Sequence, residues 1–222
     1  MKLDMRTATS RENYKAIAGC VVPRPVAWIT TVSESGVVNL APYSFFSPMS
    51  TRPPILGISM SPRADGTPKD SFHNIAATKE LVVNIAGSEL VAEVHQSGVD
   101  YAPDVSEVEA LGLELIPSET VSVPRLAKAR ASFECRYMYS LDFAPGPRWI
   151  VVEPLLAHFD DNFVDENLHV DYESYRPLGR LIADGYVINP EFVRPARDWS
   201  VPRYGDMKID LPRLTVRESG RR

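Results

Sequence analysis

Short runs of β-branched and apolar residues, joined by turn signals, constrain the fold of this chain most strongly. Residues 26–32 (VAWITTV) and 37–40 read as strands, and the tetrapeptide at 33–36 (SESG) between them is a hairpin signal. Further runs of strand character are residues 54–59, 81–86, 131–143 and 149–159. Because these runs adjoin through hairpins and not through regular alternation with helices, they predict a mainly β, antiparallel barrel of six or seven strands.

Two or three short helices are expected between the strands. Helical spacing and capping residues predict helices within 10–18, 69–79 and 88–96, capped by Ser10, by Asp70 or Ser71, and by Ser88. Segments 41–48 and 62–68 read as loops, and 108–115 as one turn of helix. We expect one domain over residues 1–222. It would carry an N-terminal arm (1–20), an acidic loop (160–173) and a Pro- and Arg-rich tail (about 190–222).

Composition excludes several classes of protein. Apolar residues make up 44% of the chain, enough for a full core, and the net charge of −5 with a pI near 5.4 argues against nucleic-acid or membrane binding driven by charge. The N-terminus has no apolar signal region and no run is long enough to span a bilayer, so we expect a cytoplasmic protein. Cys20 and Cys135 are expected as free, mostly buried thiols, with a disulfide between them as the alternative.

Motifs for side-chain chemistry are absent. The sequence contains no GxGxxG, GxxxxGK[ST], HExxH or GxSxG pattern, and its four histidines stand in separate segments. No spacing of cysteine and histidine indicates a metal site. We therefore predict no catalytic side chains and no metal. If the chain is an enzyme, a cofactor supplies its chemistry.

Two segments suit an anionic, planar ligand. Residues 41–48 (APYSFFSP) place adjacent aromatic rings among serines, which fits either a cleft for a heteroaromatic ring or a loop that plugs the barrel end. Residues 69–71 (KDS) stand at a predicted helix start, where N–H groups and the helix dipole attract a phosphate. Taken alone, however, the segment favours ordinary N-capping by Asp70 or Ser71. Arg24, between two prolines, is either a third phosphate contact or a surface cation.

An ordered series of short motifs resembles the flavin reductase-like, FMN-binding split-barrel proteins, in particular their flavoredoxin-like branch. The series covers roughly residues 12–190 and comprises Pro23–Thr31, Asn39–Phe46, Pro53–Leu56, Lys69–Ser71, Asn74-Ile75, Val82–Asn84, Gly112-Leu113, Pro124–Leu126, Phe133–Cys135 and Pro177–Arg180. Ser71 stands where threonine is commoner in the family. Ile182-Ala183 stands where a glycine pair is usual.

The resemblance implies a homodimer that binds FMN non-covalently at or near the subunit interface. By matching position, the isoalloxazine would contact Tyr43, Ser44, Phe45, Phe46 and Ser47, and the ribityl chain would border Ser59 and Ser61. The phosphate would be held by Arg24, Lys69 and Ser71, with Asp70 in the same motif. Trp28 and Arg180 would lie near the cofactor or the interface.

Three functions follow as hypotheses from this resemblance. The leading one is an NAD(P)H-dependent flavin oxidoreductase, in which NADH or NADPH passes a hydride to the flavin. A monooxygenase or another redox protein would then be its partner. The alternative is a flavoredoxin-type electron carrier that docks to a redox partner without turning over nicotinamide. The third is a barrel that has lost flavin and serves a structural or regulatory role.

Overall fold

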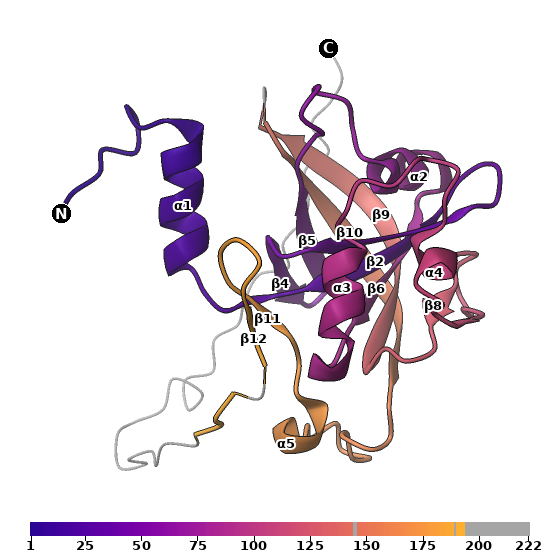
Figure 1. The fold of residues 1–222 in the computed structure, drawn as a ribbon. Helices are drawn as coiled ribbons and strands as arrows, with labels where there is room; N and C mark the ends of the chain where they lie inside the picture. Colours follow the sequence, from indigo (N-terminus) through magenta and orange to yellow (C-terminus); the bar gives the residue numbers. More distant parts are fainter. Residues whose placement is uncertain (144–145, 189, 194–222) are drawn as a thin grey trace, which may run out of the picture. The chain divides into compact units, whose positions relative to one another are not determined.

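Seven strands, all paired antiparallel, form the main sheet of the described chain (Figure 1). The computed structural model describes residues 1–143, 146–188 and 190–193. In sheet order the strands are β3 (Val38–Tyr43), β2 (Ala27–Val32), β6 (Glu80–Ile85), β9 (Ala131–Asp142), β10 (Arg148–Phe159), β5 (Pro54–Met60) and β4 (Phe46–Thr51). The expected antiparallel split barrel is confirmed.

Short strands and helices complete the unit formed by residues 1–190. The minor strands are β1 (Arg24–Pro25), β11 (Gly179–Arg180) and β12 (Tyr186–Val187), which form one small sheet, and β7 (Leu115–Ile116) with β8 (Arg125–Leu126), which form another. The helices are α1 (Ser10–Cys20), α2 (Asp70–Thr78), a 3₁₀ turn (Ser88–Leu90), α3 (Val91–Gln96), α4 (Glu107–Ala110) and α5 (Tyr172–Tyr175).

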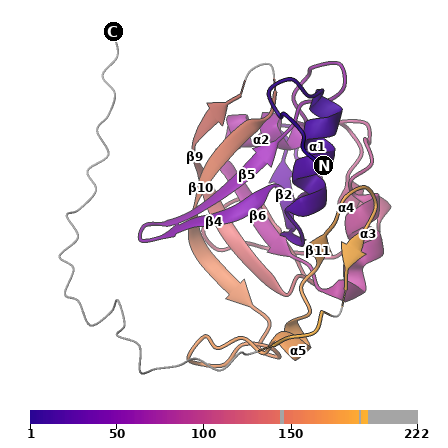
Figure 2. The same ribbon diagram turned by 90° about the vertical axis from the view of Figure 1, so that its left-hand side faces the viewer.

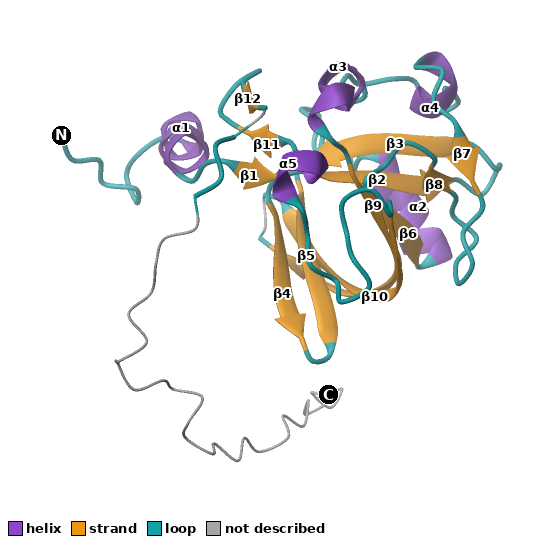
Figure 3. Ribbon diagram, turned by 90° about the horizontal axis from the view of Figure 1, so that it is seen from below, coloured by secondary structure: helices purple, strands orange, loops and turns teal. Residues whose placement is uncertain are grey.

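The strand β2 is buried on both faces, which explains why its sequence does not alternate between apolar and charged residues. Ala27 and Ile29 belong to a core enclosed by the curved sheet, together with Cys135 of β9. Trp28 lies in a second core with Val94 of α3 and with Val108 of α4. Figure 3 shows α3 and α4 on the outer side of β3, whereas β10 curves across to β5 and β4. A strand covered on both faces reads as a continuous apolar run.

The strand β4 departs from the sequence expectation, which placed a loop at 41–48. It pairs only with β5, and five of its six residues, Ser47 to Thr51, are exposed. Figure 2 shows the β4–β5 hairpin extending beyond the other strands. An edge strand that is exposed on both faces and contains a proline shows no alternation of apolar and polar residues, so the pattern that marks other strands is missing.

The first residues of the helices differ from those expected from the sequence. α1 is capped by Thr9, not Ser10: Thr9 and Glu12 form a reciprocal capping box, and the helix continues through Gly19. α2 has Lys69 at its N-cap position with no side-chain cap, so neither Asp70 nor Ser71 caps it. The segment expected as one helix at 88–96 divides into the 3₁₀ turn and α3.

The two cysteines are free, but only one of them is buried. Cys135 lies in the core, where burial raises the pKa of its thiol. Cys20 is exposed at the end of α1, which corrects the expectation of two mostly buried thiols. Among the described helices, none is long and apolar enough to cross a membrane.

Candidate functional site

Ser44 and Phe45 link the two outermost strands of the main sheet. β3 ends at Tyr43 and β4 begins at Phe46, although the two strands stand at opposite ends of the sheet order. The N–H of Ser59 on β5 donates a hydrogen bond of 2.8 Å to the carbonyl oxygen of Phe45. We call this place, residues 43–46 with Ser59, the seam. It is where the curved sheet closes on itself.

Three hollows follow one another past the seam. The first, about 310 Å³, is lined by Met60, Ser61, Phe72 and Arg148 among others, and the third, about 400 Å³, by Arg24, Ser44, His95 and Arg180 among others. The second is smaller, about 50 Å³, and lies between them. It shares Lys69 with the first hollow, and Pro42, Gly98 and Val99 with the third.

The N-terminus of α2 opens at the junction of the first two hollows. Lys69 precedes the helix in an extended conformation (φ −72°, ψ 156°), and no side chain caps the first N–H groups among the described residues. Asp70 pairs with Arg63, while Ser71 accepts a hydrogen bond of 2.9 Å from Nδ2 of Asn39. Uncapped N–H groups and the helix dipole make such an end attractive to an anion.

Lys69 has only a weak partner. Its Nζ lies 3.5 Å from Oδ1 of Asp100, whose side chain is 69% exposed. An ion pair with a partner this exposed contributes about 0–1 kcal/mol, because water and salt screen it. The ammonium group is therefore free to exchange Asp100 for a ligand anion at little cost.

Tyr43 carries a buried hydroxyl without a hydrogen bond of good geometry in the described structure. The side chain is 7% exposed and lines the second hollow. Burial raises the pKa of Tyr43 to about 12, with nearby Ser71 acting in the opposite direction. An unpaired buried hydroxyl costs about 1–3 kcal/mol, so a polar ligand atom in the hollow would stabilise it.

Arg24 is buried, and its guanidinium group is already occupied. Nη1 donates to the carbonyl oxygen of Val21 at 3.1 Å and also to that of Ala18. Nη2 donates to Leu181, and Nε lies 3.3 Å from the hydroxyl of Ser44. Arg24 therefore holds parts of the chain together from inside the protein, a role that the sequence analysis, with its choice between a phosphate contact and a surface cation, did not include. The phosphate contact expected for Arg24 stays a prediction.

Trp28 has no exposed surface, and its Nε1 donates to Oγ of Ser97 at 2.8 Å.

Arg180 lines the third hollow and donates a hydrogen bond to the carbonyl oxygen of Ala183. Its guanidinium carbon lies 4.5 Å from the ring centroid of Tyr186, on which it stacks. Ala183 takes a left-handed φ of 51°, the conformation that glycine adopts most easily. The Ile182-Ala183 turn thus keeps a backbone shape typical of a glycine.

The remaining predicted residues divide between hollows and surface. Ser44 and Ser61 line hollows, Phe45 is 36% exposed at the seam, and Ser59 forms the hydrogen bond that closes it. Phe46 packs against the inner core, and Ser47 is exposed on β4. The lining residues that the sequence interpretation missed include Met60, Phe72, His95, Asp142 and Arg148. They stand at strand or helix ends, and no local motif marks them.

The flavin reductase like domain matches residues 18–179. The chain belongs to this family. An uncharacterized protein of Aquifex aeolicus is 42% identical over 174 residues, which cover 78% of this chain and 88% of that protein.

Two solved structures are also similar to this chain. The 2-nitrobenzoate 2-nitroreductase of Pseudomonas fluorescens has a TM-score of 0.82 at 30% identity, covering 92% of this chain and 100% of that one. Component B of nitrilotriacetate monooxygenase from Bacillus cereus has a TM-score of 0.82 at 28% identity, covering 88% of this chain and 98% of that one. The expected family is therefore confirmed.

Proposed function

We propose that this chain binds FMN non-covalently and acts as an NAD(P)H-dependent flavin oxidoreductase. The observation that carries the proposal is the uncapped N-terminus of α2, which opens beside Lys69 where two hollows meet. Membership of the flavin reductase-like family supports the same cofactor. Two residue-level features test whether the chain suits FMN.

The first feature is the end that would hold the phosphate. The N–H groups of the first turn of α2, the ammonium of Lys69 and the hydroxyl of Ser71 are donors for an anion. Ser71 is 1% exposed, and its oxygen already accepts from Asn39, which orients the hydroxyl hydrogen away from that amide. The residues present therefore fit a phosphate group.

The second feature is the end that would hold the ring. The seam offers the hydroxyl of Ser44, and the unpaired hydroxyl of Tyr43 lies in the neighbouring second hollow. The Ser44 hydroxyl can bond to the polar edge of a flavin, while Phe45 gives an exposed apolar face. The Tyr43 hydroxyl lies beside Ser71, so it would bond to the ribityl-phosphate part of the cofactor and not to the ring.

The bound flavin would supply the hydride chemistry, and the chain would supply position and charge. The third hollow is lined by Arg180 and by the buried Arg24, whose pKa is lowered by burial and, to a smaller extent, by the nearby charge of Arg180. Two neighbouring cations attract an anionic electron donor such as NADH or NADPH. No side chain is needed as an acid or base in this scheme.

One spectroscopic experiment tests the proposal. Purified protein is titrated with FMN, and the FMN-loaded protein is mixed anaerobically with NADH and, separately, NADPH. The proposal expects binding, followed by bleaching of the flavin absorption with at least one donor. Binding without bleaching, together with fast reduction by a redox-partner protein, would instead identify an electron carrier. Failure to bind FMN would overturn the proposal and favour the barrel that has lost flavin.

The homodimer and the redox partner are further parts of this proposal. β9 exposes Met138, Tyr139 and Leu141 by 44–51%, and β4 exposes Met49 by 50%. Tyr139 and Leu141 stand two residues apart on β9 and therefore share one face, and large exposed apolar side chains on one face of a sheet indicate a protein contact. We expect a dimer in sedimentation equilibrium and a monomer after Leu141→Glu. The similar structure from Bacillus cereus is a monooxygenase component, which supports a monooxygenase as the consumer of reduced flavin.

A further inference from the structure

We propose that Glu107 of α4 takes up a proton when a phosphate group binds at the N-terminus of α2. This rests on the proposed function, because Lys69 and Ser71 are taken as the contacts of the FMN phosphate. It adds to that function a residue from a different element, and it links cofactor binding to pH. The proton comes from the solvent and is bound by a carboxylate oxygen of Glu107.

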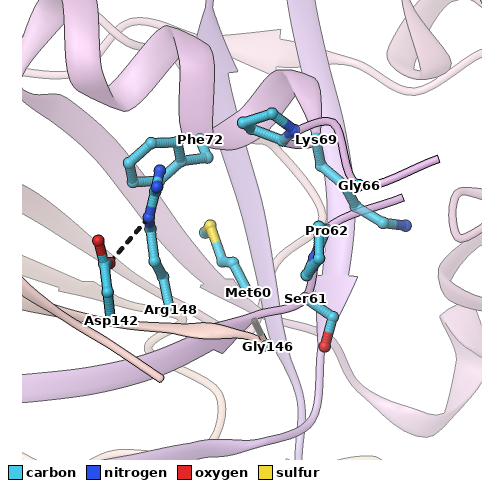
Figure 4. Close-up of a pocket in the computed structure, with 10 residues that line it drawn as sticks. Met60, Ser61, Pro62, Gly66, Lys69, Phe72, Asp142, Gly146 and Arg148 are labelled. Atoms are coloured by element: carbon cyan, nitrogen blue, oxygen red, sulfur yellow. Dashed lines mark hydrogen bonds and ion pairs between the residues drawn. The ribbon is translucent and has the colours of Figure 1, made fainter. Parts of the chain in front are cut away.

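Glu107 lies in the second hollow, among the groups that would hold the phosphate. It is 6% exposed and lines this hollow together with Tyr43, Lys69 and Ser71. Lys69 also lines the first hollow, and Figure 4 shows it from that side. The second hollow is small, about 50 Å³, so a phosphate at Lys69 and Ser71 would border the same space as the carboxyl group of Glu107.

Two contacts with β3 hold Glu107 in this place. The N–H of Leu40 donates a hydrogen bond of 2.9 Å to Oε2 of Glu107. The preceding residue, Ser106, caps α4 and donates from its hydroxyl to the carbonyl oxygen of Val38 at 2.6 Å. Turning the carboxyl group out to solvent would break the first bond and leave the buried N–H of Leu40 unpaired. The carboxyl group therefore stays in the hollow when an anion arrives.

Within the described chain, no cation forms an ion pair with Glu107. The other charged or titratable groups that line the second hollow are Tyr43 of β3, Arg63, Lys69 and Asp70 at or before the start of α2, and Asp100 and Tyr101 beyond α3. Arg63 pairs with Asp70, and Nζ of Lys69 lies 3.5 Å from Asp100. Both cations of the hollow thus already have a carboxylate partner other than Glu107.

The carboxyl group of Glu107 is therefore placed to bind a proton. Burial raises its pKa, the N–H of Leu40 opposes that rise, and the charge of Asp70 adds to it. A phosphate monoester carries a charge of about −1.5 to −2 near pH 7, which disfavours an ionised carboxyl group nearby still further. A neutral carboxyl group keeps an acceptor for Leu40, and the unpaired hydroxyl of Tyr43 in the same hollow offers an acceptor for its O–H.

Glu107 and the ligand respond to pH in opposite directions. A phosphate monoester loses charge below its second pKa of about 6, so a cationic site alone would bind FMN more weakly as pH falls. A carboxyl group whose pKa is higher in the complex than in the free protein favours the complex at low pH, and this contribution is lost as pH rises through the pKa of the complex. We expect this second response only for a flavin that carries a phosphate.

The test measures the binding of FMN and riboflavin to the intact apoprotein by fluorescence titration from pH 5.5 to 8.5. Calorimetry at pH 6 and pH 7.5, in buffers of different ionisation enthalpy, counts the protons taken up with each flavin. Both measurements are repeated with Glu107→Gln, which keeps an acceptor for Leu40 but cannot ionise. The matched control is Glu109→Gln, at an exposed position of α4 that does not line the hollow.

We expect wild type to take up protons with FMN and none with riboflavin. Glu107→Gln should bind FMN as tightly as wild type near pH 5.5 and about tenfold more tightly at pH 8.5, since one linked proton changes affinity by up to about tenfold per pH unit. It should also lose the proton uptake. Glu109→Gln should follow wild type in both measurements.

Three results would overturn the inference while leaving FMN binding and the proposed function intact. Proton release with FMN, or no change, would show that only the ionisation of the ligand responds. Uptake that persists in Glu107→Gln would assign the proton to another group, and equal uptake with riboflavin would exclude the phosphate as its cause. If Glu107→Gln does not fold, Glu107→Ala takes its place in both measurements. If neither flavin binds wild type, the proposed function fails and the inference with it.

Discussion

Nη2 of Arg24 donates a hydrogen bond of 2.8 Å to the carbonyl oxygen of Leu181, which stands 157 residues further along the chain. Through the same guanidinium group, Arg24 also contacts Ala18 in the last turn of α1 and Val21, which directly follows the helix. One buried side chain thus ties the N-terminal helix and the β11–β12 hairpin to the start of the barrel. Arg24 can therefore act as a structural anchor or as a phosphate contact, and experiment can distinguish these two roles.

Arg24→Gln is expected to lower the free energy of unfolding by about 2–3 kcal/mol, because buried carbonyls lose charge-assisted hydrogen bonds. Denaturant unfolding of the apoprotein measures this loss. If Arg24 acts only as an anchor, the affinities for FMN and riboflavin, compared by fluorescence titration, fall by the same factor. A loss confined to FMN would show that Arg24 contacts the phosphate, as the family resemblance implies.

Lys69→Gln is expected to weaken FMN about tenfold and to leave riboflavin unchanged, because only FMN carries the phosphate that a charge-assisted contact would hold. Its control is Asp100→Asn, which removes the carboxylate 3.5 Å from Nζ of Lys69. That variant should bind FMN as well as wild type or slightly better. Equal weakening of both flavins by Lys69→Gln would exclude a phosphate contact.

Tyr43→Phe removes a buried hydroxyl that has no hydrogen bond of good geometry in the described structure. We expect the apoprotein to be unchanged or up to about 1 kcal/mol more stable, since the cost of an unpaired polar group disappears. FMN affinity should fall about fivefold if the hydroxyl bonds to the flavin. Thermal unfolding with and without FMN measures both effects. A less stable apoprotein would show that the hydroxyl has a partner.

Glu134 is fully buried on β9, outside the hollows that the proposals use. It accepts hydrogen bonds from the N–H groups of Glu119 and Thr120, at 2.9 and 2.6 Å, and lies 2.7 Å from Nε2 of His158. Desolvation alone would raise the pKa of Glu134, but these hydrogen bonds together outweigh it and lower the pKa to about 2.

The depressed pKa of Glu134 predicts how stability depends on pH. The folded state favours the ionised carboxylate, so its contribution is fully present above the ordinary pKa of 4.5 and is lost as pH falls toward 2. Linkage places that contribution at about 3 kcal/mol. Urea unfolding from pH 6 to 2.5 should show a steeper loss of stability in wild type than in Glu134→Gln. Parallel curves for the two proteins would contradict this prediction.

Local sequence patterns predicted the strands that bury at least one face. The runs now seen as β2, β5, β6, β9 and β10 were expected within one or two residues of their bounds. β4 was not expected, because its exposed residues and Pro48 give no alternation, and only its pairing with β5 makes it a strand. A strand defined by its neighbour cannot be recognised from its own residues.

Residues of the candidate site could be proposed from the sequence where one short segment holds several of its groups. Lys69 and Ser71 are two residues apart in sequence and lie together at the start of α2. The role of Arg24 as an anchor was not predictable, because its partner Leu181 is distant in sequence and contributes only a main-chain oxygen. The contact between Arg148 and Phe72 was not predictable either, because tertiary packing brings together two residues that are distant in sequence.

The seam has a consequence for how sites in this chain can change. Two residues, Ser44 and Phe45, connect opposite edges of the sheet, and the hydrogen bond from Ser59 to Phe45 holds them in place. A linker this short sets an upper limit on the separation of the two edges, at about 3.3–3.6 Å per residue. The barrel therefore cannot widen there for a bulkier molecule. New specificities in such a chain would arise by remodelling the loops around 61–69 and 98–105, which can lengthen without parting the strands.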